Sequence, residues 1–201
     1  MCSYIFNLFK AGTFIVKKYL FCFLCVALFF YKAEAQSISS ADVVVLRDKI
    51  VKVGTGLLGT TEATGRNDGA VVEKILNSVG LNKGDPYCAA FNYWCYTEAG
   101  GAKFVPRSGW SPDWVKSPTW TRTSGGLNPK PGDSFGIFFK SKNRVAHTGL
   151  VKKWGDTSLV TLEGNTSPDA EAGSAADRDG GGVWSKRRLK IQIYAVRNWL
   201  D

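Results

Sequence analysis

The sequence predicts an α+β domain, because helix-like segments fill its first half and strand-like segments its second half. Apolar residues recur at the helical period up to about residue 99. Shorter runs that alternate apolar and polar residues, separated by turn residues, follow Pro131. Such successive strands favour an antiparallel sheet, and the helices are expected to pack on its face.

The first 35 residues are expected to be a secretory signal peptide. Lys17 and Lys18 precede the apolar stretch 19–31, and Ala33-Glu34-Ala35 offers a small-x-small cleavage site. The apolar stretch holds about a dozen residues, whereas a membrane-spanning helix needs roughly 20. We therefore expect an exported protein, periplasmic or extracellular. An uncleaved N-terminal anchor is the main alternative.

Residues 36–201 are long enough for a single domain with a hydrophobic core. They hold 22 Lys and Arg against 16 Asp and Glu, a net charge of +6. In an exported protein this excess favours an anionic envelope polymer over nucleic acid as the partner. We expect a monomer that binds no nucleic acid and does not insert stably into a membrane after signal cleavage. The densest basic run, Lys186-Arg187-Arg188-Leu189-Lys190, is typical of the solvated face of an edge strand, with a binding patch as the alternative.

Three helices are expected, at residues 41–53, 71–79 and 87–99. A glycine follows each of them directly. Ser40 is a plausible N-cap of the first helix, which should break at Gly54. Gly80 takes the C′ position after the second. The third is apolar on nearly all sides, so it should be the buried central helix.

A long connection, 108–131, separates the helices from the strands and contains Trp110, Trp114 and Trp120. Connections longer than about 12–15 residues are often functional loops. The indole rings either line a cleft that stacks against sugar or peptide, or pin an irregular loop to the core.

Four strand segments are expected after this connection, the last being one strand or a pair: 134–140, 146–154, 158–164 and 183–196. A loop rich in Gly, Ala and Asp precedes the last of them. Calcium binding by the carboxylates of this loop is only a minor alternative, because they lack the EF-hand spacing. These carboxylates are Asp169, Glu171, Asp177 and Asp179. One histidine and two cysteines show no ligand spacing either, and we expect no metal and no cofactor.

Outside the signal peptide the chain keeps only Cys88 and Cys95. Within one helix they stand roughly 10 Å apart at ~1.5 Å per residue, whereas bridged Cα atoms lie about 4.4–6.8 Å apart. We expect no disulfide, and Cys95 should pack in the core. Cys88 falls in the first turn of the central helix, where unpaired N–H groups and the positive dipole end stabilise a thiolate. It is therefore the candidate nucleophile.

His147 is the one histidine of the chain, so any histidine-dependent chemistry must use it. A histidine base needs an orienting partner on its second nitrogen. Glu163 and Asn165 end the following strand, and either can lie beside the imidazole if the two strands are antiparallel neighbours. A structural histidine and an exposed strand-end carboxylate are the alternatives.

Several motifs together, in this order, resemble the CHAP family, the cysteine, histidine-dependent amidohydrolases/peptidases related to NlpC-type and papain-like enzymes. They are Gly84-Asp85-Pro86-Tyr87-Cys88-Ala89-Ala90-Phe91, Trp94, Glu98-Ala99-Gly100, Pro131-Gly132-Asp133, His147-Thr148-Gly149-Leu150-Val151 and Glu163-Gly164-Asn165. The resemblance covers about residues 46–166. Tyr87 stands where tryptophan is common, and Asn92 where an aliphatic residue is usual.

The resemblance implies a papain-like fold and a peptidoglycan hydrolase. Cys88 would attack an amide carbonyl, His147 would activate it and protonate the leaving amine, and Glu163 or Asn165 would orient the imidazole. Tyr87 and the three tryptophans are the expected substrate-binding residues. The target would be the muramoyl-L-alanine amide or a bond of the stem or cross-bridge peptide. A non-catalytic wall-binding module, and a cysteine protease or transferase acting on protein, are the alternatives.

Overall fold

The computed structural model describes residues 38–171 and 173–201, so the expected signal peptide, 1–35, lies outside the described residues. Ser40–Asp201 folds as one unit. Within the described ranges, no helix is both long and apolar enough to cross a membrane.

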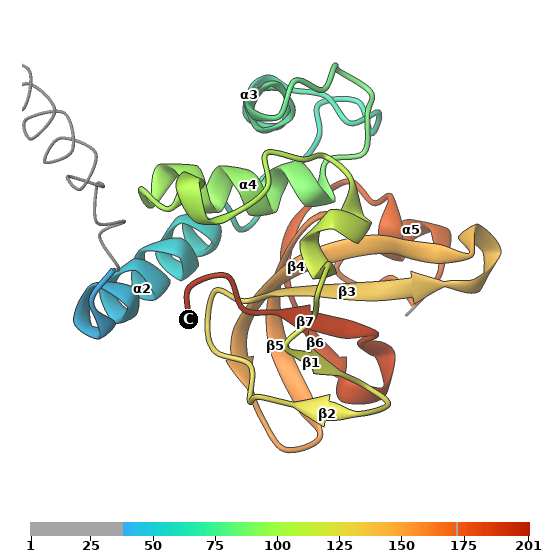
Figure 1. Ribbon diagram of the computed structural model, residues 1–201. Helices are drawn as coiled ribbons and strands as arrows, with labels where there is room; N and C mark the ends of the chain where they lie inside the picture. The colour runs from blue at the N-terminus through green and yellow to red at the C-terminus, as the bar shows by residue number, and fades with distance from the viewer. Residues whose placement is uncertain (1–37, 172) are drawn as a thin grey trace, which may run out of the picture. The chain divides into compact units, whose positions relative to one another are not determined.

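All three expected helices are present: α2 (Ser40–Gly56), α3 (Ala70–Ser78) and α4 (Cys88–Glu98). The helix α4 contacts both other helices and the strands β4 and β5 of the sheet (Figure 1). The expected break at Gly54 is wrong, because α2 continues through it. A Cβ at Gly54 would stand only 3.0 Å from Leu162 and 3.4 Å from Cys95. The glycine therefore lets α2 pass close to α4 and the sheet.

The helices pack on a seven-stranded sheet in the order β2-β1-β7-β3-β4-β5-β6, in which every neighbouring pair is antiparallel. This confirms the α+β prediction. The strands are β1 (Trp120–Thr121), β2 (Gly125–Gly126), β3 (Ser134–Phe139), β4 (Arg144–Trp154), β5 (Ser158–Thr166), β6 (Gly182–Leu189) and β7 (Ala195–Arg197). The last expected segment is thus two strands, β6 at one edge and β7 between β1 and β3.

Short helical turns occupy the connections. They are η1 (Ala102–Phe104), η2 (Ser111–Val115), η3 (Lys140–Lys142), α5 (Ala175–Arg178) and η4 (Lys190–Gln192). Two of them bear on the site: η2 packs against β3 and β4, and α5 packs against β4 and β5. Both therefore border the strands that carry His147 and Glu163.

Buried apolar side chains fill the space where α4 meets β4 and β5, among them the fully buried Phe91, Leu150 and Leu162. Cys95 is also fully buried, and neither Cys95 nor Cys88 forms a disulfide. The sequence-based prediction of a free core cysteine is confirmed.

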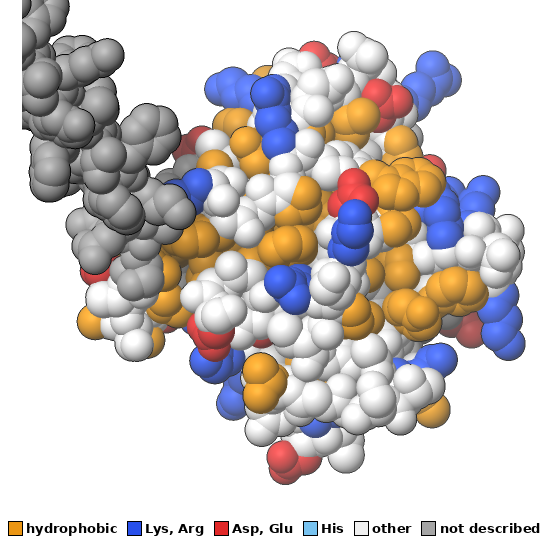
Figure 2. Space-filling view, in the orientation of Figure 1, with side chains coloured by type: hydrophobic (Ala, Val, Ile, Leu, Met, Phe, Trp, Pro, Cys, Tyr) orange, Lys and Arg blue, Asp and Glu red, His pale blue; other side chains and the backbone are white. Residues whose placement is uncertain are grey.

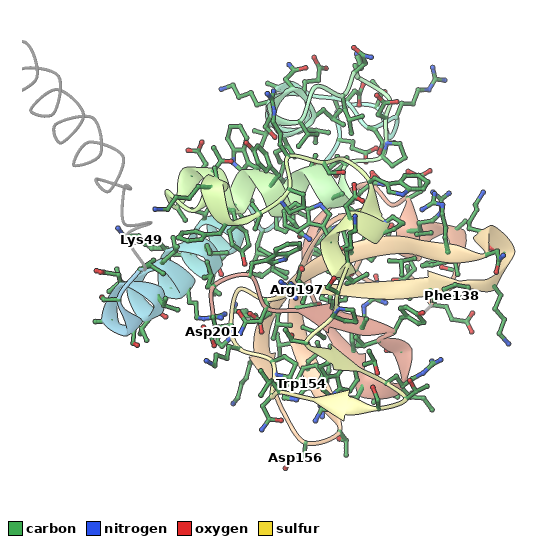
Figure 3. All side chains as sticks on the ribbon, in the orientation of Figure 1. Lys49, Phe138, Trp154, Asp156, Arg197 and Asp201 are labelled. Atoms are coloured by element: carbon green, nitrogen blue, oxygen red, sulfur yellow. The ribbon has the colours of Figure 1, made fainter. Side chains whose placement is uncertain are left out.

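Arg47 of α2 joins three distant parts of the chain. Its Nη1 donates to Pro131 O (2.8 Å) and to Asp133 Oδ1 (2.7 Å), and its Nη2 donates to Asn198 Oδ1 (2.7 Å). Asp201 Oδ1 accepts a further bond from Nη2 at 3.1 Å, and the end of the chain lies near α2 (Figure 3). One guanidinium therefore holds the first helix, the turn before β3 and the C-terminus together.

Candidate active site

Cys88 is the first residue of α4, as predicted. The first i→i−4 bond of the helix runs from Phe91 N to Tyr87 O, so the N–H groups of Cys88, Ala89 and Ala90 precede the helical ladder. The sulfur is 3.4 Å from the hydroxyl of Ser111 in η2. Cys88 thus stands at the positive end of a helix with donors around its sulfur.

His147 lies on β4, is fully buried, and meets Glu163 of β5 through Nε2 and Oε2 at 2.8 Å. A Cβ at Gly149 would approach Glu163 Cγ to 2.9 Å. The glycine two residues after the histidine therefore leaves room for the stem of its partner. The structure brings Cys88, His147 and Glu163 into one cluster.

The thiol and the imidazole alter each other's protonation. Burial alone would raise the pKa of Cys88, but His147, then Ser111 and the backbone of Thr148, lower the pKa of that thiol. Burial alone would lower the pKa of His147, but Cys88 and Glu163 raise that pKa to about 9. Both shifts favour a thiolate beside an imidazolium.

The second ring nitrogen of His147, Nδ1, is buried and makes no hydrogen bond of standard geometry to the described residues. Since Nε2 is engaged by Glu163, Nδ1 is the nitrogen left for the Cys88 thiol. The imidazole therefore has one side for the carboxylate and the other for the sulfur.

Glu163 is the centre of a buried charge network that the sequence-based reasoning missed. Arg188 donates to its two oxygens, through Nε at 2.9 Å and Nη2 at 2.5 Å, and Thr161 Oγ1 also donates to it. The other side of the Arg188 guanidinium binds Asp177, which also accepts from Lys186 Nζ at 2.8 Å. Although burial would raise the pKa of Glu163, Arg188 and His147 hold it well below its usual range.

The expectation that the basic run around Lys186 and Arg188 is solvated is therefore wrong for these two residues. Both point inward from β6 and are buried, whereas Arg187 between them is exposed. The sequence does contain a signal for this burial: Lys186 and Arg188 follow the half-buried Trp184 at intervals of two residues, so all three side chains point to the same face of the strand.

Asn165 does not contact His147, and the expectation that it orients the imidazole is corrected. Its Oδ1 accepts from Tyr87 N (3.3 Å), and its Nδ2 donates to Arg178 O (3.2 Å) and Asp179 Oδ1 (3.0 Å). It adopts a left-handed conformation with φ of 60°. Asn165 thus ties the start of α4 to α5.

A pocket of about 180 Å³ opens beside Cys88, which is only 3% exposed at its wall. Its lining comes from the loop before α4, from η2 and the residues before it, from β4 and from α5: Leu81, Asp85, Pro86, Cys88, Gly109, Trp110, Ser111, Arg144, Ala146 and Arg178. Trp110 is half exposed there, so its role as a substrate contact remains a prediction.

The other three expected substrate contacts do not line this pocket. Tyr87 and Trp114 are fully buried; Trp114 donates to Ser108 O and packs against Tyr96, so it pins the loop to the core. Trp120 packs edge-on against Trp154 at 5.1 Å, in the region of β1 and β2 (Figure 3). Irregular loops give no periodicity from which burial can be predicted.

The carboxylates considered for calcium are not gathered. Asp177 is engaged by Lys186 and Arg188, and Asp179 by Asn67 and Asn165. In the described part of the chain no group of three or more His, Cys, Asp or Glu side chains is placed to hold a metal.

Comparison with known proteins gives one family match. Residues 80–165 match the model of the CHAP domain, a span that includes Cys88, His147 and Glu163. The structure of an NlpC/P60 family protein from Bacillus cereus ATCC 10987 is similar with a TM-score of 0.43 and 14% identity, over 77% of this chain and 40% of that one. This chain therefore spans less than half of that protein. No curated protein matches the sequence.

Proposed function

We propose that this protein, whose residues 80–165 match the model of the CHAP domain, is an exported, cysteine-dependent peptidoglycan hydrolase. It cleaves an amide bond of the cell wall through an acyl-enzyme. The bond is the muramoyl-L-alanine amide or one in the stem or cross-bridge peptide.

The observation that carries the proposal is the pairing of the Cys88 thiol with an imidazole that Glu163 orients. A thiolate is the nucleophilic form of cysteine, and an imidazolium can return a proton to a leaving amine. A buried histidine with a purely structural role would not need a neighbouring thiol of lowered pKa. The arrangement therefore favours a catalytic role for His147 over a structural one.

The reaction then follows in two steps. The Cys88 thiolate attacks the amide carbonyl, the N–H groups at the start of α4 stabilise the oxyanion, and His147 Nδ1 protonates the departing amine as the C–N bond breaks. Water, deprotonated by the now neutral His147, attacks the thioester and releases a carboxylate. The thiolate and the imidazolium are thereby regenerated.

Charge supports an anionic polymer as the substrate. Residues 36–201 carry a net charge of +6. On the face in Figure 2, Lys and Arg side chains lie mostly toward the edges rather than in one block. A spread of positive charge raises the encounter rate with an anionic wall without forming the dense patch typical of nucleic-acid binding.

The test is digestion of purified peptidoglycan by the wild-type protein, Cys88→Ala and Cys95→Ala. We expect fragment release by the wild type and by Cys95→Ala, because the Cys95 side chain is buried in the core. We expect no release above background by Cys88→Ala. Mass spectrometry of the fragments identifies the bond: a new L-alanine N-terminus means an amidase, and a freed D-amino acid or cross-bridge amine means an endopeptidase.

Three results would contradict the proposal. Undiminished fragment release by Cys88→Ala would show that Cys88 is not the nucleophile. Binding to the wall by a folded wild-type protein that releases nothing would instead identify a wall-binding module. Cleavage of protein but not of wall would identify a protease.

A further inference from the structure

Two arginines border the pocket beside Cys88. Arg144 at the start of β4 and Arg178 at the end of α5 both line it. Among the pocket residues that the structure describes, Asp85 is the one acidic side chain, and it already accepts a bond from Asn82 N at 2.8 Å. The wall of the pocket therefore carries excess positive charge.

Arg178 is partly withdrawn from water and has no close acceptor among the described residues. Its side chain is 19% exposed, and its ion-pair contact with Asp179 Oδ2 is 3.8 Å long. Within the described residues its guanidinium donates no hydrogen bond. A guanidinium has five N–H donors in a planar fork, and such donors form their strongest hydrogen bonds with anionic acceptors.

The backbone that carries Arg178 is fixed. Asn165 Nδ2 donates to Arg178 O at 3.2 Å. The preceding residue, Asp177, is held by Lys186 and Arg188 at 2.8 Å each. The backbone from which the guanidinium extends is thus in place before a ligand arrives, so binding has to order only the side chain.

Arg144 supplies a second oriented guanidinium. It stacks on Trp110 with 4.0 Å between its central carbon and the ring centroid. Its Nη1 donates to Val145 O at 2.9 Å. Stacking fixes the plane of the guanidinium and leaves most of its N–H groups for a ligand in the pocket.

We propose that this pocket is a subsite for a free carboxylate on the peptide substrate, close to the amide that Cys88 attacks. This inference rests on the proposed function, since it takes an amide-linked peptide as the substrate. A carboxylate accepts two parallel bonds from a guanidinium fork. The pocket volume of about 180 Å³ is below the roughly 300–1,000 Å³ of sites that enclose a whole small molecule, so it receives only the acidic residue.

The test uses two muropeptides that differ in one group: the α-carboxylate of the γ-linked D-glutamate is free in one and amidated in the other. We expect wild-type kcat/KM to be roughly 10-fold higher for the free carboxylate, as for one charge-assisted contact in a partly open pocket. Arg178→Gln should lose this preference, mainly through KM. Arg178→Lys should retain part of it. Arg187→Gln, the same change on the exposed face of β6, should keep it in full.

A binding measurement separates this inference from the proposed function. Cys88→Ala should bind the muropeptide with the free carboxylate more tightly than the amidated one, with isothermal titration calorimetry as the readout. Equal affinities, no binding of either muropeptide, or a preference that survives Arg178→Gln would overturn the subsite. Preferential binding without any hydrolysis by the wild type would instead sustain the subsite and refute the hydrolase.

Discussion

Cys88 and His147 shift each other's pKa in opposite directions. The pKa of the Cys88 thiol is lowered and the pKa of His147 is raised to about 9. The two groups titrate as a coupled pair. Between the two titrations the thiolate and imidazolium coexist, which is the form the proposed reaction needs.

The pH dependence follows from the signs of these shifts. Above about pH 9 the imidazolium loses its proton, so no acid remains for the leaving amine, and kcat/KM should fall. On the acidic side kcat/KM should fall as the thiolate gains a proton, at a pH below the ordinary range of a cysteine. The measurement is kcat/KM from pH 4 to 11, with circular dichroism to exclude unfolding. Activity that keeps rising beyond pH 10 while the protein stays folded would contradict this assignment.

Glu163 and Asn165 show how far the sequence can define a site. Residues two apart in a strand point to the same face, so alternation offers both as partners for His147. The structure separates them because the pairing of β5 with β6 shifts register after Glu163 and Asn165 takes a left-handed conformation. That irregularity depends on β6 and α5, which lie later in the chain.

Asn92 explains a departure from the family pattern. It is fully buried in α4 and its Nδ2 donates to Thr148 Oγ1 at 3.1 Å and to Gly149 O at 3.4 Å. Thr148 and Gly149 are the two residues after His147. The amide thus joins α4, which carries Cys88, to the strand of His147 through hydrogen bonds, whereas an aliphatic side chain would contribute only packing.

At the scale of elements, β6 is an edge strand that buries the charged side chains of Lys186 and Arg188 on one of its faces. Arg188 bridges Glu163 of β5 and Asp177 of α5. Breaking a buried ion pair by removing one partner is costly, because the remaining charges are uncompensated. The edge strand is therefore held by electrostatics as well as by its ladder.

Removing that bridge should destabilise the fold. Arg188→Met preserves apolar packing volume but leaves Asp177 paired with Lys186 alone and Glu163 with His147 alone, and we expect a loss of about 3–5 kcal/mol in the free energy of unfolding. Urea denaturation measures it. Arg187→Met, on the exposed face of the same strand, is the matched control and should have little effect. Equal effects of the two changes would show that burial of Arg188 does not matter.

The elements differ in how well the sequence predicts them. Long periodic segments such as α4 and β4 were predicted to within two residues, because one buried face leaves a clear pattern. The strands β1 and β2 are two residues each, too short to alternate. The inward face of β6 was missed because Lys and Arg were taken as exposed, and buried pairing depends on contacts distant in sequence.

At the scale of the molecule, Arg47 connects α2 with the last residues of the chain through hydrogen bonds and ion pairs. Its partner Asp133 is fully buried, and Asn198 lies 151 positions away along the chain. These contacts close only when both ends of the domain are in place.

Loss of Arg47 should therefore weaken the whole domain. Arg47→Met strands Asp133 without its cation, and we expect about 3–5 kcal/mol lower stability, measured by urea denaturation with tryptophan fluorescence. Lys49→Met, exposed on the same helix, serves as the control. A second, separate transition in the variant, rather than one transition at lower urea, would show that the ends unfold independently.

The guanidinium of Arg188 sits outside residues 80–165, the span that matches the CHAP domain, and so does its second carboxylate, Asp177. That span therefore contains the three proposed catalytic residues but not the guanidinium that binds Glu163 on its other side. A chimera that borrows only this span would keep the pairing of His147 with Glu163 and lose the ion pair of Glu163 with Arg188. Transfer of the site to another scaffold therefore requires the segment that extends through β6. The end of that segment is set by the need to balance the buried charges, and not by the end of the span that matches the CHAP domain.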